Sequence, residues 1–521
     1  MAGWVCILAQ TLNMLCKVYG CAVFGIDAIP VTIEVNIDNG IGYHLVGLPD
    51  NAIRESNYRI AAALLNNGLR IPGKKITINM APADLRKEGS AYDLPLAIGI
   101  LVASAQLEVT HLSEYVVMGE LSLDGALLPV KGALPIAIGA RDAGFKALIL
   151  PAANAEEAAV VNELEVYAVQ NLSEVIALLR NRGHLNPIQA IIPKALSANP
   201  GNLPCFSEVK GQETVKRCFE ITAAGGHNLI LVGPPGAGKT MLAKRLSGIL
   251  PPMSLQEALE TTKIHSVVGK NVGGLILDRP FRSPHHTISD VALVGGGAYP
   301  QPGEISLAHN GVLFLDELPE FKRNVLEVMR QPLEDREVTL SRARFTITYP
   351  SSFMLVASMN PSPGGFFTDE NNRFQHSRAE RQRYLNRISG PLLDRIDMHM
   401  EVSPVPFEKM TTMQVEETSE QIRNRVVQAR AIQTKRFMRE GIHCNAQMQV
   451  RHLRKFCKLN TGPLNILSVA MKQLKLSARA YDRILKVSRT IADLDHVEQI
   501  NEQHIAEAIG YRSLDREGWL G

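Results

Sequence analysis

The sequence feature that most restricts the fold of this chain is an apolar run that leads through a glycine-rich loop into a helical stretch. The run covers residues 229–232, the loop GPPGAGKT covers 233–240, and MLAKRLSGIL follows at 241–250. This order matches the pattern G-x-x-x-x-G-K-[ST] in the strand–loop–helix context that a phosphate-binding loop requires. The glycines let backbone N–H groups converge on phosphate oxygens, and the helix N-terminus adds a favourable dipole. The pattern predicts an α/β domain that binds a nucleotide.

Within the loop, Lys239 supplies positive charge to the outer phosphates, and the hydroxyl of Thr240 can coordinate Mg²⁺. We therefore expect ATP and Mg²⁺ as the cofactors of this chain. The expected nucleotide-binding residues are eight consecutive positions: Gly233, Pro234, Pro235, Gly236, Ala237, Gly238, Lys239 and Thr240.

A second motif follows the loop by about 75 residues, at GVLFLDE (311–317). Four apolar residues that end in two carboxylates suit a buried central strand, which delivers acidic side chains to the ligand-binding edge of an open α/β sheet. Asp316 is expected to hold Mg²⁺, and Glu317 is expected to act as the general base on the attacking water. Together the two motifs predict ATP hydrolysis.

The length of 521 residues is too great for one core, and the pattern divides the chain into several parts. Residues 14–182 alternate strand-like runs (31–37, 43–48, 75–81 and 147–151) with helical ones (51–67, 94–105 and 132–144), as an α/β or α+β domain does. Residues 183–205 are rich in Pro, Asn and Gly, as a linker is. Residues 206–405 alternate strand and helix signals in the βαβ style of a parallel sheet, and residues 409–515 are helical.

Composition favours a reduced, cytoplasmic protein. The seven cysteines form no C-x-x-C pair, and no apolar run approaches the roughly 20 residues that span a membrane. Residues 1–13 are apolar but carry no basic residue, so they read as a short extension rather than a signal peptide, and Met14 is an alternative start to Met1.

Charge is distributed unevenly along the chain. Residues 1–185 hold five more acidic than basic residues, whereas residues 409–521 hold seven more basic than acidic residues. A basic C-terminal region permits contact with nucleic acid, although a solvated helical surface has the same composition.

Longer motifs carry a specific resemblance. RSPHHTISDVALVGGG (282–297) and residues 302–321 resemble magnesium-chelatase-like AAA+ proteins, and KVYGCAVFGIDA (17–28) and HLVGLPDNAIRES (44–56) narrow this to the YifB/ComM family. The similarity continues through residues 86–101 and 118–135 and covers nearly the whole chain from Met14. It implies an α/β protein with a Lon-protease-like N-terminal domain, a central AAA+ domain with a parallel sheet, and a chelatase-type helical lid. It also implies a homo-hexamer and, for the ComM branch, an ATP-driven branch-migration helicase used in natural transformation.

The resemblance also suggests roles for three polar residues. Asn360 looks like the sensor-1 Asn that positions the water, Arg395 like the arginine finger that reaches a neighbouring subunit's nucleotide, and Arg479 like the sensor-2 Arg of the lid. Each arginine could instead be an ordinary surface charge. If Arg395 is a finger, the protein must oligomerise to be active.

Two activities of related proteins are not expected here. In the Lon pattern the nucleophilic Ser falls on Ala91, beside Ser90, and the activating Lys falls on Leu134, with Lys131 nearby, so the N-terminal domain is expected to lack the Ser–Lys dyad. The related chelatases need a separate porphyrin-binding subunit for metal chelation, so this activity is not expected from the resemblance. The adjacent His285 and His286 cannot share one helix face as ligands, and are expected to shape the insertion after the phosphate loop. Many relatives carry a cysteine-rich loop after sensor 1, and residues 360–378 hold no cysteine.

Residues 337–349 (EVTLSRARFTITY) alternate apolar and polar residues about a turn, which predicts a β-hairpin. Relatives insert a pore hairpin at this place, so Arg342 at the tip and Arg344 beside it could hold a DNA backbone. A solvated turn is the alternative.

Three functions remain open from the sequence. The first is a hexameric DNA motor that promotes branch migration in homologous recombination or natural transformation, on branched or single-stranded DNA. The second is a protein- or complex-remodelling ATPase whose N-terminal domain recruits a protein partner. The third, a protease–ATPase, would need protease chemistry that the N-terminal domain is expected to lack. DNA-stimulated ATP turnover separates the first two, and no membrane partner is expected.

Overall fold

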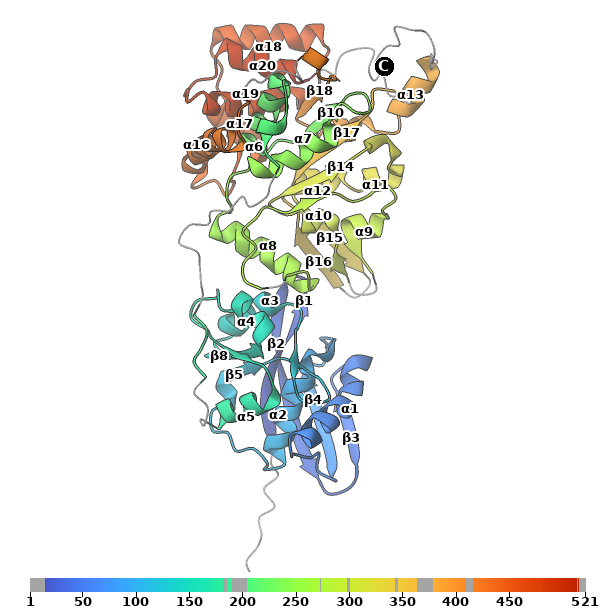
Figure 1. The fold of residues 1–521 in the computed structure, drawn as a ribbon, viewed down its shortest axis with the longest axis vertical. Coiled ribbons are helices and arrows are strands. Elements are labelled where there is room, and N and C mark those ends of the chain that lie inside the picture. Colours follow the sequence, from blue (N-terminus) through green and yellow to red (C-terminus); the bar gives the residue numbers. More distant parts are fainter. Residues whose placement is uncertain are drawn as a thin grey trace, which may run out of the picture. The chain divides into compact units, whose positions relative to one another are not determined.

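The computed structural model describes residues 15–180, 185–189, 204–271, 273–297, 300–342, 345–362, 378–408, 416–512 and 514. The chain forms two compact units (Figure 1). The first contains residues up to 195 together with Ala258–Ile276, and the second contains Leu196–Glu257 and Leu277–Gly521. In the described residues, no helix is both long enough and apolar enough to cross a membrane.

The first unit is built on a mixed seven-stranded sheet in the order β3-β4-β2-β1-β5-β8-β9. Strand β2 pairs antiparallel with β1 and β4, while β3 and the strands beyond β1 join in parallel. A separate hairpin is formed by β6 and β7. The strands are β1 (Cys16–Phe24), β2 (Asp27–Asp38), β3 (Gly42–Val46), β4 (Lys75–Ala81), β5 (Tyr115–Val117), β6 (Glu120–Leu121), β7 (Leu127–Leu128), β8 (Ala147–Pro151) and β9 (Glu165–Val169).

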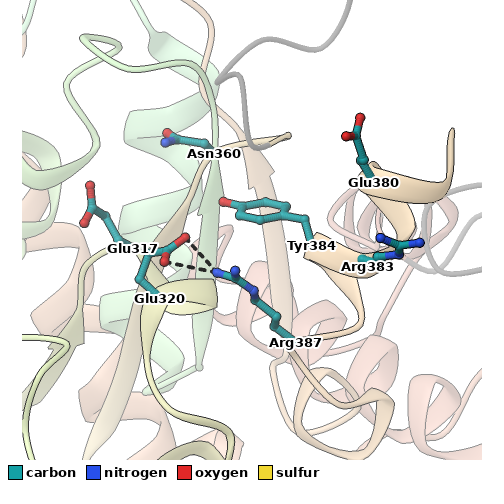
Figure 2. A pocket seen from close by; sticks show the side chains of 7 residues that line it. All are labelled: Glu317, Glu320, Asn360, Glu380, Arg383, Tyr384 and Arg387. Atoms are coloured by element: carbon teal, nitrogen blue, oxygen red, sulfur yellow. Dashed lines mark hydrogen bonds and ion pairs between the residues drawn. The ribbon is translucent and has the colours of Figure 1, made fainter. Parts of the chain in front are cut away.

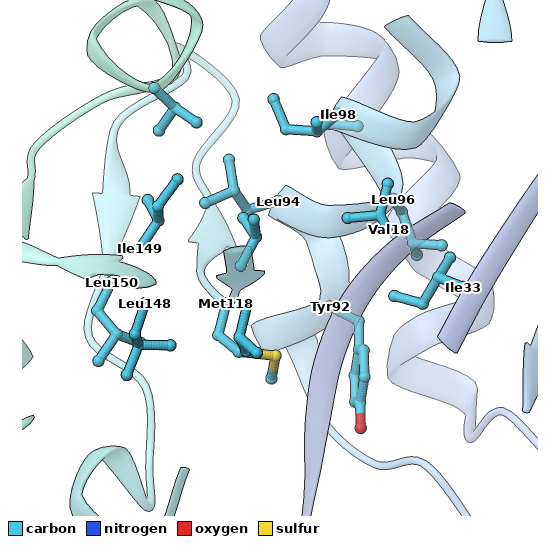
Figure 3. Packing of buried hydrophobic residues seen from close by; sticks show 14 of the residues in the cluster. Val18, Ile33, Tyr92, Leu94, Leu96, Ile98, Met118, Leu148, Ile149 and Leu150 are labelled. Carbon is cyan, nitrogen blue, oxygen red and sulfur yellow. The ribbon is translucent and has the colours of Figure 1, made fainter. Parts of the chain in front are cut away.

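Helices cover this sheet, and α2 forms the centre of the core. Its sequence DLPLAIGILVA is apolar around the whole helix, which is the pattern of a buried helix, and it packs against β1 and β2 (Figure 3). At Gly99 a Cβ atom would lie 2.7 Å from a methyl of Val35, so the close approach of helix and sheet requires glycine. The helices are α1 (Asn51–Asn66), η1 (Ser90–Tyr92), α2 (Asp93–Ala103), η2 (Leu112–Glu114), α3 (Ala133–Asp142), α4 (Ala152–Ala158) and α5 (Leu172–Leu179).

A segment from the middle of the chain completes the first unit. Helix α8 (Leu255–Val267) begins in the second unit, but residues from Ala258 onward belong to the first. There the Gly132 amide donates to the Ser266 carbonyl over 3.0 Å, and the Lys263 ammonium lies 3.5 Å from the Asp27 carboxylate. The range 206–405 predicted for the AAA+ domain therefore includes residues that fold with the N-terminal unit.

The second unit contains a five-stranded, entirely parallel sheet in the order β11-β14-β17-β10-β18. Two of its central strands, β10 and β14, are wholly apolar and buried, as strands covered on both faces are. Leu229 and Leu231 enter one apolar cluster with the C-terminal helices, whereas Ile230 and Val232 enter a second cluster on the other face. The strands are β10 (Leu229–Val232), β11 (Phe281–Arg282), β14 (Val312–Leu315), β17 (Met354–Met359) and β18 (Met398–Glu401).

Short helices and two small hairpins surround this sheet. The helices are η3 (Phe206–Glu208), α6 (Glu213–Gly225), α7 (Lys239–Arg245), η4 (Leu246–Gly248), α9 (Asp290–Val294), α10 (Glu304–Leu307), η5 (Leu318–Glu320), α11 (Arg323–Glu327), α12 (Arg330–Asp335), α13 (Arg378–Leu385) and α14 (Gly390–Leu393). The hairpins pair β12 (Gly295–Gly296) with β13 (Gln301–Pro302), and β15 (Glu337–Arg342) with β16 (Phe345–Pro350). The second pair confirms the hairpin predicted at 337–349.

The C-terminal region is helical, as predicted, and its helices α16 and α19 pack on α6. Together with the parallel sheet and the α/β N-terminal unit, this confirms the expected fold class. The helices are α16 (Ser419–Phe437), η6 (Asn445–Gln447), α17 (Val450–Phe456), α18 (Thr461–Gln473), α19 (Ala478–Leu494) and α20 (Glu502–Gly510).

A buried carboxylate joins α19 to the sheet. The carboxylate of Asp397, just before β18, accepts a hydrogen bond from the backbone amide of Asn228 over 2.9 Å. It lies 3.1 Å from the Arg483 guanidinium and 3.5 Å from the His227 ring. Burial alone would raise the pKa of Asp397, but Arg483 and His227 outweigh burial and hold this pKa well below its usual value.

Replacement of Asp397 by asparagine is expected to lower the free energy of unfolding by about 3 kcal/mol, because it leaves the Arg483 charge, which is only 17% exposed, without its partner. The change is measured as a shift in the urea midpoint. Asp142→Asn is the matched control, since Asp142 pairs with Arg141 at the surface over 2.7 Å and should cost less than about 1 kcal/mol. Equal losses in the two variants would contradict the prediction.

Candidate active site

The glycine-rich loop lies at the carboxyl end of β10, in the middle of the parallel sheet. Gly236 and Gly238 have φ angles of 79° and 86°, in the left-handed region that favours glycine. A Cβ atom at Gly236 would meet nothing within 4 Å, so this part of the loop faces open space, whereas at Gly233 it would lie 2.2 Å from the Val402 carbonyl oxygen. The loop therefore keeps one side packed on the protein and one side open to a ligand.

Lys239, the first residue of α7, places its ammonium inside the loop. Its hydrogen bonds go to the carbonyl oxygens of Gly233 over 2.7 Å and Pro234 over 3.0 Å, and to the side-chain oxygen of Asn360 over 3.0 Å. Burial lowers the pKa of Lys239, against the opposing charges of Asp316 and Glu317. A buried ammonium that is bonded to neutral oxygens leaves positive charge available to a phosphate.

Thr240 and Asp316 meet at the edge of the sheet where Mg²⁺ is expected. The Thr240 hydroxyl donates to an Asp316 carboxylate oxygen over 2.6 Å, and the Ser358 hydroxyl donates to the other oxygen. Carboxylate and hydroxyl oxygens suit Mg²⁺, which usually binds through one or two protein ligands, substrate phosphates and water. These side chains fit the ion that the sequence predicts.

Glu317 and Asn360 border a cavity of about 410 Å³ (Figure 2). Glu317 has a φ angle of 54°, and its amide donates to the Ser358 hydroxyl over 3.3 Å, which turns the chain at the end of β14. Its side chain is 58% exposed, so a water molecule can reach the carboxylate. The cavity is lined by Glu317, Glu320, Asn360, Glu380, Arg383, Tyr384 and Arg387.

The far wall of this cavity was not predicted from the sequence. Arg387 pairs with both carboxylate oxygens of Glu320, at 3.0 and 3.1 Å (Figure 2). The hydroxyl of Tyr384 bonds to the backbone of Asn360, and burial raises the pKa of Tyr384 to about 12. The sequence signal that could have indicated Tyr384 and Arg387 is the basic and aromatic run RQRYLNR, which follows the sensor-1 position.

The side chains of Arg395 and Arg479 both lie within ion-pair distance of the Glu334 carboxylate. The Arg395 guanidinium is 2.7 Å from Glu334 and donates to the Pro391 carbonyl over 2.6 Å, and its side chain is 10% exposed. The Arg479 guanidinium is 3.9 Å from Glu334 and 3.6 Å from Asp394, and its side chain is 52% exposed. Among the described residues, neither arginine has a hydrogen bond or ion pair with the phosphate-binding loop or with Glu317. Among the described residues, both arginines therefore contact Glu334, and neither contacts the phosphate-binding loop of its own chain.

The remaining sequence-predicted positions lie elsewhere. Arg342 ends β15, where its backbone pairs with Phe345, and Arg344 lies outside the described residues. In the first unit, Ala91 lies in η1, where the neighbouring Ser90 hydroxyl donates to the Glu120 carboxylate. Leu134 is buried in α3, and its amide donates to Glu157 over 3.0 Å.

Known proteins match this chain over most of its length. Family models match residues 205–410 ("Magnesium chelatase, subunit ChlI"), 33–154 ("Subunit ChlI of Mg-chelatase") and 416–512 ("Magnesium chelatase, subunit ChlI C-terminal"). The chain is 46% identical over 500 residues to the uncharacterised protein YifB of Salmonella typhimurium, covering 95% of this chain and 96% of that protein. It is 47% identical over 501 residues to YifB of Escherichia coli, with the same coverage. It is 46% identical over 506 residues to the competence protein ComM of Haemophilus influenzae, covering 96% and 98% of the two chains.

Proposed function

This chain belongs to the YifB/ComM family of magnesium-chelatase-like AAA+ proteins, and we propose that it is an ATP-hydrolysing motor that promotes branch migration of DNA. The observation that supports ATP hydrolysis is the open phosphate-binding loop, with Lys239 inside it and Thr240 bonded to Asp316 beside Glu317.

In the proposed reaction, each side chain has a separate task. Lys239 and the loop amides hold the phosphates, while Glu317 accepts a proton from the attacking water and Asn360 orients that water. Thr240 and Asp316 would hold Mg²⁺, which when bound neutralises the charge that develops on the phosphates.

Arg395 and Arg479 are proposed to act on the nucleotide of a neighbouring subunit. This is supported because, in the described residues, neither guanidinium group contacts the loop of its own chain, and both lie near Glu334. A role in trans requires a neighbouring subunit, and a homo-hexameric ring is the proposed assembly.

DNA is proposed as the substrate on three grounds. The Haemophilus influenzae relative is named a competence protein. The C-terminal region is basic in sequence, and Arg342 is the last residue of β15 in the hairpin β15–β16. On the exposed face of this hairpin, Thr339 and Thr348 lie opposite each other, and so do Ser341 and Thr346, each pair with hydroxyls 3.3 Å apart. Hydroxyl and guanidinium groups bind phosphate oxygens without reading sequence.

Replacement of both Arg342 and Arg344 by alanine is expected to weaken DNA binding equally for all sequences, because phosphate contacts carry no sequence information. The slope of log affinity against log salt should fall by about two, or one for each lost phosphate contact. Replacement of both Arg141 and Lys146 by alanine, in the first unit, is the control, since it also removes two positive charges and should leave the slope unchanged. An equal change in both variants would show that only net charge matters.

The second candidate function is remodelling of a protein complex. It is favoured by residues 258–276, which lie between the two nucleotide motifs in sequence yet fold with the N-terminal unit. Helix α8 contains residues of both units, so this helix links a partner of the N-terminal unit to the ATPase part of the chain. The two functions are separated by measuring ATP turnover without DNA, with duplex DNA and with a four-way junction. Stimulation by the junction supports the motor, and turnover that no DNA changes would favour remodelling.

A further inference from the structure

A histidine of the segment 282–297 lies beside the proposed general base. The Nδ1 atom of His286 is 3.8 Å from a carboxylate oxygen of Glu317. The His286 side chain is 34% exposed, so it lines the approach to Glu317 without closing it. The neighbouring His285 has a different polar contact, since its Nδ1 lies 3.0 Å from the Thr287 hydroxyl.

The sheet topology explains why His286 reaches this place. Strand β11 pairs in parallel with β14, with Phe281 opposite Val312 and Arg282 opposite Leu313. Parallel neighbours end at the same edge of a sheet, so the residues that follow β11 come to the edge where β14 delivers Glu317. The end of β11 is fixed there because Arg282 makes two bonds to Glu304, at 2.6 and 2.7 Å.

Two other rings hold the imidazole of His286. Its ring lies against that of His285, with centroids 4.1 Å apart and an interplanar angle of 34°. On another side, the ring of Phe321 meets it edge-on, with centroids 6.4 Å apart and an angle of 78°. These two ring contacts limit the rotamers that the imidazole can adopt beside Glu317.

Among the described residues, the Glu317 carboxylate has few contacts that hold its orientation. The hydrogen bonds of Glu317 to Asp316 and Ser358 are made by its backbone amide and leave the side chain free to rotate. The Lys239 ammonium is bonded to two carbonyls and Asn360. In the part of the chain that the structure describes, the ion-pair neighbour of this carboxylate is His286. A general base must lie within hydrogen-bond reach of its water, so its rotamer matters.

We infer that His286 is a positioning residue for Glu317: its imidazole N–H donates to the carboxylate and holds the second oxygen toward the attacking water. A closure of about 1 Å brings the two atoms from their present separation to hydrogen-bond distance. In the hydrolytic step the water proton passes to Glu317 and the water oxygen bonds to phosphorus as ADP leaves, while His286 gains and loses no proton. The inference rests on the proposed ATP hydrolysis.

Three variants of the full-length protein test it. His286→Phe keeps a ring against His285 and Phe321 but removes the N–H group, so kcat should fall about tenfold while the Kd of a fluorescent ATP analogue stays within twofold. His286→Asn places an amide nitrogen near the position of Nδ1 and should recover most of kcat. His285→Phe is the matched control and should stay within twofold of the wild type.

A readout without turnover completes the test. The ring carbon–proton NMR signal of His286 should move in Glu317→Gln relative to wild type, and the signal of His285 should not. Unchanged kcat in His286→Phe would overturn the inference, and so would equal activity of the Phe and Asn variants, because ring packing alone would then explain both. A wild-type protein that hydrolyses no ATP would overturn the proposed function itself.

Discussion

Glu317→Gln is expected to bind ATP as the wild type does and to hydrolyse it about a thousandfold more slowly, within the range that general-base removal costs. The amide keeps the shape of the side chain, so the turn at the end of β14 and the bonds of its backbone amide to Asp316 and Ser358 are retained. It cannot accept the water proton. The measurement is steady-state phosphate release, alongside the Kd of a fluorescent ATP analogue.

Glu320→Gln is the matched control for that variant. Glu320 lines the same cavity three residues later, and its side chain pairs with Arg387 at the surface (Figure 2). Loss of an exposed pair is worth less than about 1 kcal/mol, so turnover should change by less than about fivefold. If the two variants lose the same activity, the general base is not Glu317.

Lys239→Ala is expected to remove ATP binding rather than slow the chemistry, with a loss of at least about a hundredfold in turnover at fixed ATP. The ammonium is the buried positive charge of the loop, and alanine leaves the carbonyls of Gly233 and Pro234 without their donor. Thermal unfolding gives a direct readout, because ATP at about 100 times its Kd should stabilise the wild type by about 2.7 kcal/mol and the variant not at all.

The control for Lys239 is Lys244→Ala, on the same helix α7. Lys244 is exposed, so its loss should leave the stabilisation by ATP unchanged. Stabilisation of Lys239→Ala to the wild-type level would contradict the role given to Lys239.

The parts of the fold that the sequence predicts are those specified by contiguous residues. The apolar run 229–232, the loop and α7 follow one another directly, so their pattern predicts both the elements and their order. The run VLFLDE likewise becomes β14 with its carboxylates at the strand end, where the sheet register brings Asp316 to Thr240. In the first unit the strands predicted at 31–37 and 75–81 lie within β2 and β4, because clear alternation marks them.

Other features depend on contacts between distant residues and leave no local signal. Nothing in residues 258–276 indicates that they pack with the N-terminal unit, since the contact of Ser266 with Gly132 joins positions 134 apart in sequence. Glu334 has no motif of its own, yet it brings Arg395 and Arg479 together. The sequence of β1, CKVYGCAVF, does not predict a strand, because it departs from strict apolar–polar alternation around Gly20 and Cys21.

His286 shows the same limit at the scale of one side chain. Because His286 follows His285 directly, the two side chains cannot share one helix face as ligands, and the sequence predicts instead that they shape the insertion after the phosphate loop. The distance of His286 from Glu317 follows from the pairing of β11 with β14, which a single sequence does not reveal.

Movement of a fluorescently labelled four-way DNA junction is the measurement that tests the proposed motor most directly, with wild type and Glu317→Gln compared in ATP and Mg²⁺. We predict that the wild type converts the junction into two duplexes only when ATP is present, and that Glu317→Gln binds the junction without converting it. Hydrolysis of ATP by a wild-type protein that leaves the junction unmoved would contradict the DNA-motor account.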